Sequence, residues 1–350
     1  MGDARGHSPV VTWTTEDVLT FLLGYGRCPT DLRVETLPGW WFNLVLLVEA
    51  DGERLVLRRY GVTPPEEVRW ELAVLTHLRA HEFPTIGPLP RSDVENDRLS
   101  EFLGKPAVLY PYIEGTNRGA LDWAPAVAQT AAAVARLHEL TSELKVPYPR
   151  VASGTESRRM LREFLKTMES RGVAATEPGL RGLVDASRAG LERFEARLAE
   201  HAEGLPRGVV HHDAHHGNVL FNDGRLVALI DFDDAHEGYL VADLAAMVEN
   251  WADEQVTGQA LNREKAVRVV REYERHRRLT EAERELLPDF VQVFMLADAT
   301  EMVRGEMAQG ADSETAVNED RTYVQYLDLV RDTGWAAALR GAPTSSAGSR

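Results

Sequence analysis

The sequence predicts an α+β protein of two lobes, in which a small β-rich N-terminal lobe precedes a larger helical one. The chain has 350 residues, more than one typical core holds. Strand-like runs gather before residue 112, and helical periodicity dominates after it. A Pro- and Gly-containing break at 111–115 separates the two regions. We therefore expect an N-terminal lobe over 1–112, a C-terminal lobe over 113–340 and a disordered tail over 341–350.

The elements of the first lobe follow from start signals and periodicity. A helix should begin at Thr14–Asp17, and strands should follow at 32–37, 44–48 and 55–60. Asp51-Gly52 joins the last two as a hairpin turn. After Pro64-Pro65 a helix should bury one stripe, made of Val68, Leu72, Leu75 and Leu78. A further strand is expected at 107–110.

The second lobe should be mainly helical. Short apolar strands are expected at 208–210 and 226–230, on either side of a polar loop. Helices are expected over the ranges 126–140, 158–168, 180–203, 240–251, 263–277, 281–304 and 317–331.

Composition excludes several classes of protein. The formal net charge of −16 argues against a nucleic-acid partner, since phosphate binding needs clustered Lys and Arg. No apolar run reaches the ~20 residues that span a bilayer, and no secretory signal opens the chain. Cys28 is the single cysteine, so an internal disulfide is impossible and a reducing, cytoplasmic setting fits. A monomer or a homodimer is expected.

One polar segment has the residues that phosphoryl transfer needs. Asp213 and Asn218 lie in a loop, and Asp231 follows thirteen residues after Asn218 at the end of an apolar strand. The hairpin at 221–225 should bring Asn218 and Asp231 together. Asp213 would then orient the acceptor hydroxyl and take its proton, while the other two would hold Mg²⁺ against the phosphates of a nucleotide.

This segment resembles a family signature. His-x-Asp-x-x-x-x-Asn followed by Ile-Asp-Phe, here His211 to Asn218 and then Asp231, is similar to the motif of aminoglycoside phosphotransferases, choline kinases and related homoserine kinases. The segment at 241–245 resembles the Asp-Leu-Ala helix start of that family. The resemblance implies a protein-kinase-like fold and a kinase that uses ATP, with GTP as an alternative, together with Mg²⁺. Departures are His212, where the family has Gly, and Trp40 and Trp41 in the loop over the phosphates.

The resemblance also implies a nucleotide site in the first lobe. Arg58 matches the basic residue that holds the phosphates, and Glu71 on the next helix could orient it through an ion pair. Asn43 fits the pattern of the phosphate-covering loop. The hinge at 110–113, which includes Tyr110, Tyr112 and Ile113, would face adenine with its backbone. His138, in a Leu-His pair, is interpreted as a hydrogen-bonded core residue.

The acceptor stays open among three classes: an antibiotic sugar or aminocyclitol, homoserine or a similar amino alcohol, and choline or ethanolamine. We expect a compact hydroxylated molecule with an amine, because carboxylates gather around an aromatic side chain after the metal-binding segment. These residues could equally belong to a generally acidic surface. The candidate substrate residues are Asp233, Asp234, Glu237, Glu249, Trp251 and Asp253.

Two interpretations from other classes compete. The cluster of His211, His212, His215 and His216 with Asp213 could bind zinc in a hydrolase, with His236 as a further ligand. However, the His-x-His-x-Asp-His order of metallo-β-lactamase-like enzymes is absent. A kinase-like binding module without activity is the second alternative, and the retention of Asp213, Asn218 and Asp231 together argues against it.

Overall fold

The computed structural model describes residues 11–37, 43–94, 97–117, 121–149, 155–172, 177–252, 261–332 and 334–341. Three predicted features lie outside the described residues: the loop with Trp40 and Trp41, Asp253, and nearly all of the tail. The chain forms two compact units, called here the first and the second unit. The first unit comprises Met1–Thr116, Lys145–Arg150 and Leu220–Asp233, and the second comprises Asn117–Leu144, Val151–Val219 and Asp234–Arg350.

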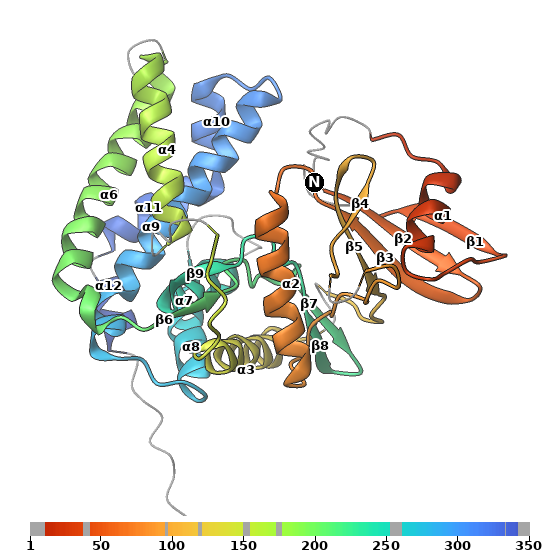
Figure 1. Ribbon diagram of the computed structural model, residues 1–350. Helices are drawn as coiled ribbons and strands as arrows, with labels where there is room; N and C mark the ends of the chain where they lie inside the picture. Colours follow the sequence, from red (N-terminus) through yellow and green to blue (C-terminus); the bar gives the residue numbers. More distant parts are fainter. Residues whose placement is uncertain are drawn as a thin grey trace, which may run out of the picture. The chain divides into compact units, whose positions relative to one another are not determined.

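A five-stranded antiparallel sheet is the centre of the first unit, in the order β1-β2-β3-β5-β4 (Figure 1). Asp51 and Gly52 both have positive φ, 49° and 83°, so the turn between β2 and β3 has the form that matches strand twist. Alternate residues of β2 and β3 are buried, as a sheet with one face on a core requires. The strands are β1 (Leu32–Thr36), β2 (Leu44–Ala50), β3 (Glu53–Arg59), β4 (Ser100–Phe102) and β5 (Lys105–Pro111).

Two helices complete this unit as the sequence predicts. Helix α1 (Thr15–Leu23) begins at a capping box in which Thr14 and Asp17 satisfy each other's backbone N–H groups. Its apolar face joins the core over the sheet through Val18 and Leu22, which are fully buried. Helix α2 (Pro65–Ala80) buries the whole predicted stripe, Val68, Leu72, Leu75 and Leu78.

The hairpin of β7 (Val219–Asn222) and β8 (Arg225–Leu229) lies mostly in the first unit, which differs from the expected division of the chain. The boundary expected at 112 falls at Thr116, and Leu220–Asp233 joins the first unit although it was assigned to the second lobe. Backbone bonds explain this: Thr116 exchanges two hydrogen bonds with Phe221, and the Thr85 hydroxyl donates to the Leu229 carbonyl. The segment that contains Asp231 is therefore tied to the first unit.

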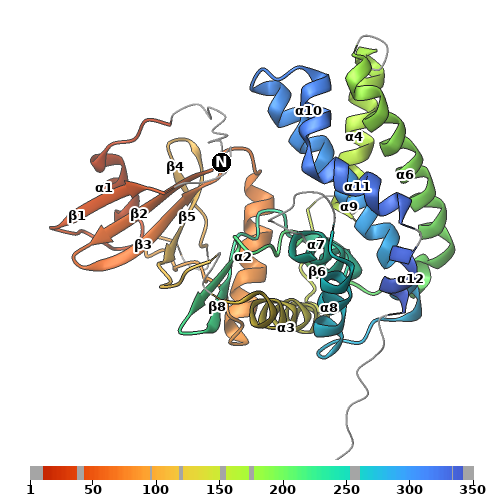
Figure 2. The same ribbon diagram turned by 180° about the vertical axis from the view of Figure 1, so that it is seen from behind.

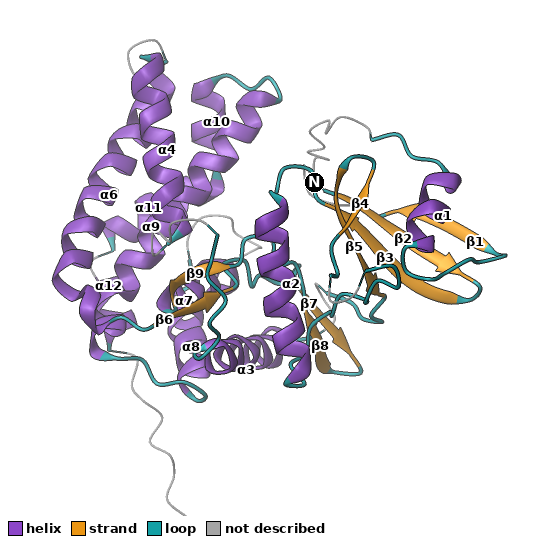
Figure 3. Cartoon of the chain, viewed as in Figure 1, coloured by secondary structure: helices purple, strands orange, loops and turns teal. Residues whose placement is uncertain are grey.

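The second unit is helical, with one two-stranded sheet of β6 (Arg207–Val210) and β9 (His236–Tyr239) (Figure 3). Helices α4 and α6 lie side by side, and α9 packs against both (Figure 2). The helices are α3 (Trp123–Thr141), α4 (Glu156–Arg171), α6 (Arg181–His201), α7 (Val241–Ala252), α8 (Arg263–Glu274), α9 (Glu281–Ala308), α10 (Ser313–Glu319), α11 (Arg321–Arg331), α12 (Gly334–Arg340) and the 3-10 turns η1 (Pro178–Leu180) and η2 (Ala202–Gly204).

One predicted helix is wrong in extent. The range 317–331 is divided between α10 and α11, because Asp320 has an extended backbone (φ −66°, ψ 112°). Its side chain accepts a hydrogen bond from the Tyr323 N–H and caps α11, as Asp does at helix starts. None of the helices in the described part of the chain is both long and apolar enough to cross a membrane.

Candidate active site

Arg58 is the centre of the charged cluster in the first unit. It lies near the end of β3, and its guanidinium NH2 is 2.8 Å from Asp231 Oδ1 and 2.5 Å from Asp233 Oδ2. Burial disfavours the charge, but Asp231 and Asp233 outweigh this cost, so the pKa of Arg58 is raised further. One cation is thus held between two carboxylates from a segment 173 residues away.

Asp231 and Asn43 are positioned by their backbones and by this cluster. Asp231 has φ 66°, a left-handed conformation that few residues other than glycine adopt, and this turns the chain as it leaves β8. The Asn43 side chain donates to Asp233 and accepts from the Gly61 N–H at 3.1 Å, so it connects the segment after β8 with the segment after β3. Asp233 therefore lies in the Arg58 cluster, and its predicted contact with the acceptor stays a prediction.

Glu71 lies on α2, is 4% exposed and has another partner than the one expected. Its Oε1 accepts a hydrogen bond from the Tyr60 hydroxyl at 3.0 Å, while the ion pairs of Arg58 go to Asp231 and Asp233. Burial raises the pKa of Glu71 to about 8, Asp233 adds to the rise, and Arg58 opposes it. Glu71 and Arg58 thus influence each other through their charges, while the ion pairs of Arg58 are made with Asp231 and Asp233.

The hinge residues differ in what their side chains do. Tyr110 is buried, and its hydroxyl lies 3.1 Å from that of Tyr60. Tyr112 donates its N–H to the Arg54 carbonyl, and the Arg54 guanidinium stacks 3.7 Å from its ring centroid. Ile113 is half-buried. A role of this backbone in binding adenine stays a prediction.

The loop of the second unit holds Asp213 and Asn218 together. Asn218 Nδ2 donates to Asp213 Oδ2 at 2.7 Å and to the Asp213 carbonyl at 3.0 Å. The Asp213 N–H in turn donates to His211 Nδ1 at 3.2 Å. The carboxylate predicted to accept the proton and the amide predicted to bind metal are therefore direct neighbours in one turn.

Asp243, at the start of α7, anchors this loop. It is fully buried, and its two oxygens accept the N–H groups of His211 and His212 at 2.8 and 2.6 Å. Burial opposes its charge, but these bonds and His138 lower the pKa of Asp243. His212 has φ 71°, so a side chain stands where the related motif has glycine, in a conformation that glycine adopts more readily.

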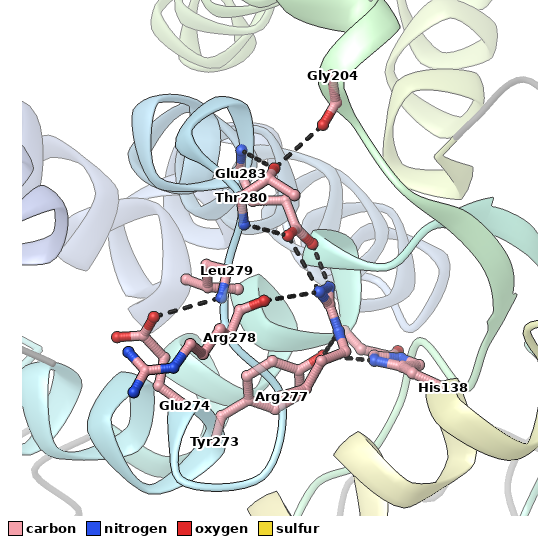
Figure 4. Close-up of polar contacts among 10 residues, drawn as sticks. His138, Gly204, Tyr273, Glu274, Arg277, Arg278, Leu279, Thr280 and Glu283 are labelled. Atoms are coloured by element: carbon pink, nitrogen blue, oxygen red, sulfur yellow. Dashed lines mark hydrogen bonds and ion pairs between the residues drawn. The ribbon is translucent and has the colours of Figure 1, made fainter. Parts of the chain in front are cut away.

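A chain of polar contacts continues from His138 into the helices (Figure 4). His138 Nε2 lies 2.8 Å from Asp243 Oδ2, and its Nδ1 lies 2.6 Å from the Tyr273 hydroxyl. Arg277 donates Nε to the same hydroxyl and forms an ion pair with Glu283. This confirms the interpretation of His138 as a buried, hydrogen-bonded histidine and connects the loop to α3, α8 and α9.

The residues predicted to bind the acceptor have separate surroundings. Trp251 donates Nε1 to the Ala214 carbonyl at 2.9 Å, so it connects α7 to the loop that contains Asp213. Glu237 lies on β9, 3.6 Å from Arg207. Glu249 is buried on α7, and Asp234 is exposed. Asp234 is thus exposed and the Glu237 side chain is 44% exposed, while Glu249 and Trp251 are buried, and the contact of these residues with an acceptor stays a prediction.

The histidines of the loop point to different partners, which weakens the zinc interpretation. His212 packs its ring on His236 and Phe294, and His215 Nδ1 accepts the Gly217 N–H. His216 has its ring 6.3 Å from that of Trp251. Within the described ranges, no three His, Cys, Asp or Glu side chains are arranged to hold a metal ion.

Sequence reasoning missed the anchoring role of Asp243 and the place of Asp233. The Asp-Leu-Ala pattern at 243–245 was a usable signal for the first, since an acidic residue at a helix start is poised to accept N–H groups. No local signal showed that Asp233 would pair with Arg58, because that pairing depends on long-range topology.

Comparison with known proteins gives a family match over most of the chain. Residues 33–279 match the model of a phosphotransferase enzyme family, APH. A homoserine kinase of Caulobacter sp. is 30% identical over 80% of this chain and 83% of its own length. A homoserine kinase of Chelativorans sp. is 33% identical, over 57% of this chain and 58% of that protein.

Solved structures share the fold at low identity. The amicoumacin kinase hAmiN, solved with AMP-PNP and Ca²⁺, superposes with a TM-score of 0.66 at 18% identity and covers 89% of this chain and 93% of its own. A microcompartment-associated aminopropanol kinase gives a TM-score of 0.62 at 17% identity, over 94% of this chain and 100% of that one. Both likenesses support the two-lobed, protein-kinase-like architecture.

Proposed function

Because this chain belongs to the phosphotransferase enzyme family and is a small-molecule kinase with a hydroxyl acceptor, we propose that it moves the γ-phosphoryl group of Mg-ATP to an amino alcohol. The Arg58 cluster would bind the phosphates of the nucleotide, and the Asp213 loop would act on the acceptor. Positioning and charge neutralisation would supply most of the rate enhancement.

Asp213 is the proposed base. Its carboxylate would accept a hydrogen bond from the acceptor hydroxyl and take the proton as the oxygen attacks phosphorus. The Asn218 bond at 2.7 Å fixes the carboxylate in the loop, and Asp243 fixes the loop. Asn218 and Asp243 would therefore both serve to position Asp213.

The donor set fits Mg²⁺. Asp231 and Asn218 offer hard oxygen atoms, and Mg²⁺ commonly takes one or two protein ligands and keeps several waters. The Asp231 side chain is 38% exposed, so a hydrated ion could reach it. When bound, the ion would neutralise charge on the phosphates. Arg58 would add a second cation there, with Asp233 and Asn43 keeping its guanidinium in place.

The choice of an amino alcohol rests on one observation. Three relatives with 30% or greater identity are homoserine kinases, which match over 57–80% of this chain. The amicoumacin kinase matches at 18% identity, which supports the fold alone. L-Homoserine is therefore the first acceptor to test, and Asp234 is the proposed contact for its amine.

An ATP-consumption screen tests the proposal. The panel should contain L-homoserine, aminopropanol, choline, ethanolamine, hydroxylated antibiotics and neutral sugars, each with Mg²⁺ and with either ATP or GTP. We expect consumption with an amino alcohol, lost in Asp213→Asn and kept in Asp223→Asn, a matched change in the exposed turn of the β7–β8 hairpin. Phosphorylation of neutral or anionic compounds alone would reject the amine and leave the kinase activity standing.

A further inference from the structure

His215 is held in a defined tautomer by its own loop. The Gly217 N–H donates to His215 Nδ1 at 2.7 Å. A nitrogen that accepts a hydrogen bond bears no proton, so the neutral ring must bear its proton on Nε2. The Gly217 N–H thus makes Nε2 the ring nitrogen that can donate a hydrogen bond.

That donor faces Asp213. His215 Nε2 lies 3.5 Å from Asp213 Oδ2, the oxygen that also accepts Asn218 Nδ2 at 2.7 Å. The first distance is long for a hydrogen bond, but such contacts often shorten when the substrate is in place. The side chains of His215 and Asp213 are 29% and 35% exposed, so the contact orients the carboxylate more than it alters stability.

Gly217 leaves the space that the imidazole occupies. A Cβ added at Gly217 would lie 2.4 Å from His215 Cε1 and 2.9 Å from Nδ1. The φ of Gly217 lies outside the left-handed region, so its backbone would accept alanine. The ring itself is therefore the reason for a glycine here, which indicates that the loop is built around this imidazole.

We propose that His215 is a positioning residue for Asp213. His215 Nε2 donates a hydrogen bond to Asp213 Oδ2, and His215 and Asn218 together orient the carboxylate plane toward the acceptor hydroxyl. The proposal rests on the proposed role of Asp213 as the base. The alternative is that His215 only ties the turn through Gly217, which would require the acceptor at Nδ1 and nothing at Nε2. These two roles call for different nitrogen atoms, so they can be separated by substitution.

Two substitutions separate the roles of the two imidazole nitrogens. His215→Gln places an amide N–H near the position of Nε2, and His215→Asn places an amide oxygen near that of Nδ1. We expect His215→Asn to lower kcat about tenfold with KM for ATP unchanged, and His215→Gln to stay within about threefold of the parent. An unchanged kcat in His215→Asn, or equal losses in both, would overturn the proposal. His81→Gln, at an exposed histidine after α2, is the matched control.

A double-mutant cycle tests the role of Gly217. Gly217→Ala should displace the ring and reproduce most of the loss seen in His215→Ala. In the His215→Ala background the same change should cost less than about twofold, because the clash has gone. Additive losses in kcat would mean that Gly217 acts independently of His215, which contradicts the proposal.

A measurement without any acceptor separates this proposal from the proposed function. Two-bond ¹H–¹⁵N spectra of protein labelled in its histidines should show His215 protonated at Nε2, with a resonance that shifts in Asp213→Ala. A proton on Nδ1, or no shift, would refute the contact. If the parent phosphorylates none of the panel, the proposed function fails while the tautomer result still decides the His215–Asp213 contact.

Discussion

Two buried carboxylates, Glu71 in the first unit and Asp243 in the second, show how differently burial can act. Glu71 accepts a hydrogen bond from Tyr60 and has two acidic neighbours, and burial raises its pKa to about 8. Asp243 accepts two backbone N–H groups and His138, and its pKa falls. The number of donors, more than the depth of burial, decides which protonation state the fold favours.

The same contrast separates the two sets of site residues. In the first unit, side chains hold one another, and Arg58, Asp231, Asp233 and Asn43 form a charged cluster. In the second unit, backbone N–H groups and one buried anchor hold the loop.

The largest effect is expected at the loop. Asp213→Asn should lower kcat at least about a thousandfold, because general-base catalysis and the charge of the carboxylate are both lost. ATP affinity, measured by calorimetry, should be nearly unchanged. Substantial phosphorylation by this variant would show that the anchored loop does not hold the base.

The next effect is expected in the charged cluster. Asp231→Ala should weaken Mg²⁺-dependent ATP binding by roughly 10- to 100-fold, because Asn218 cannot supply the lost charge. It also removes one of the two carboxylates that face Arg58. Calorimetric titration with and without Mg²⁺ measures this, and equal binding of Mg-ATP by variant and parent would exclude Asp231 as the metal ligand.

A smaller effect on stability is expected at the anchor. Asp243→Asn replaces an oxygen that accepts N–H groups by a donor, in a fully buried site. The free energy of unfolding should fall by about 3 kcal/mol near pH 7. Because the pKa of Asp243 is lowered in the folded state, the stability that its carboxylate supplies is lost as the pH falls through the folded pKa. The difference in free energy of unfolding between parent and variant should therefore become smaller in acid. Urea unfolding at several pH values measures this, and an equally stable variant would deny the anchoring role.

The smallest effect is expected at Glu71, with the opposite sign. Its unfolded carboxyl titrates near pH 4.3 and its folded one at about 8, so the folded state binds more protons between these values and stability falls as the pH rises. Glu71→Gln should remove this slope. Relative to the parent, its free energy of unfolding should therefore rise as the pH increases from 5 to 8, measured by urea unfolding. A growing loss at high pH would show that Glu71 is stabilised as an anion.

Local features of the fold were predictable, whereas distant pairings were not. The capping box at Thr14, the Asp51-Gly52 turn and the buried stripe of α2 follow from neighbours in sequence. The spacing of Asp213, Asn218 and Asp231 likewise pointed to phosphoryl transfer. The place of Asp233 depends on which segments meet in space, which single-sequence patterns do not encode, whereas the anchor at Asp243 had a local signal in its Asp-Leu-Ala pattern. The break at Asp320 had a local signal, an Asp at a helix start, which apolar periodicity obscured.

The first unit is not contiguous in the chain, and this affects how it is made. Arg58 emerges from the ribosome 175 positions before Asp233, its later counter-ion, as the numbers 58 and 233 give. At ordinary rates of synthesis that interval lasts roughly 10 to 35 s. During this time β3 is available to fold, yet its guanidinium lacks both carboxylates. A nascent chain that ends at residue 116 would thus have the sheet without its charge balance, and cotranslational completion of this unit must await the β7–β8 hairpin.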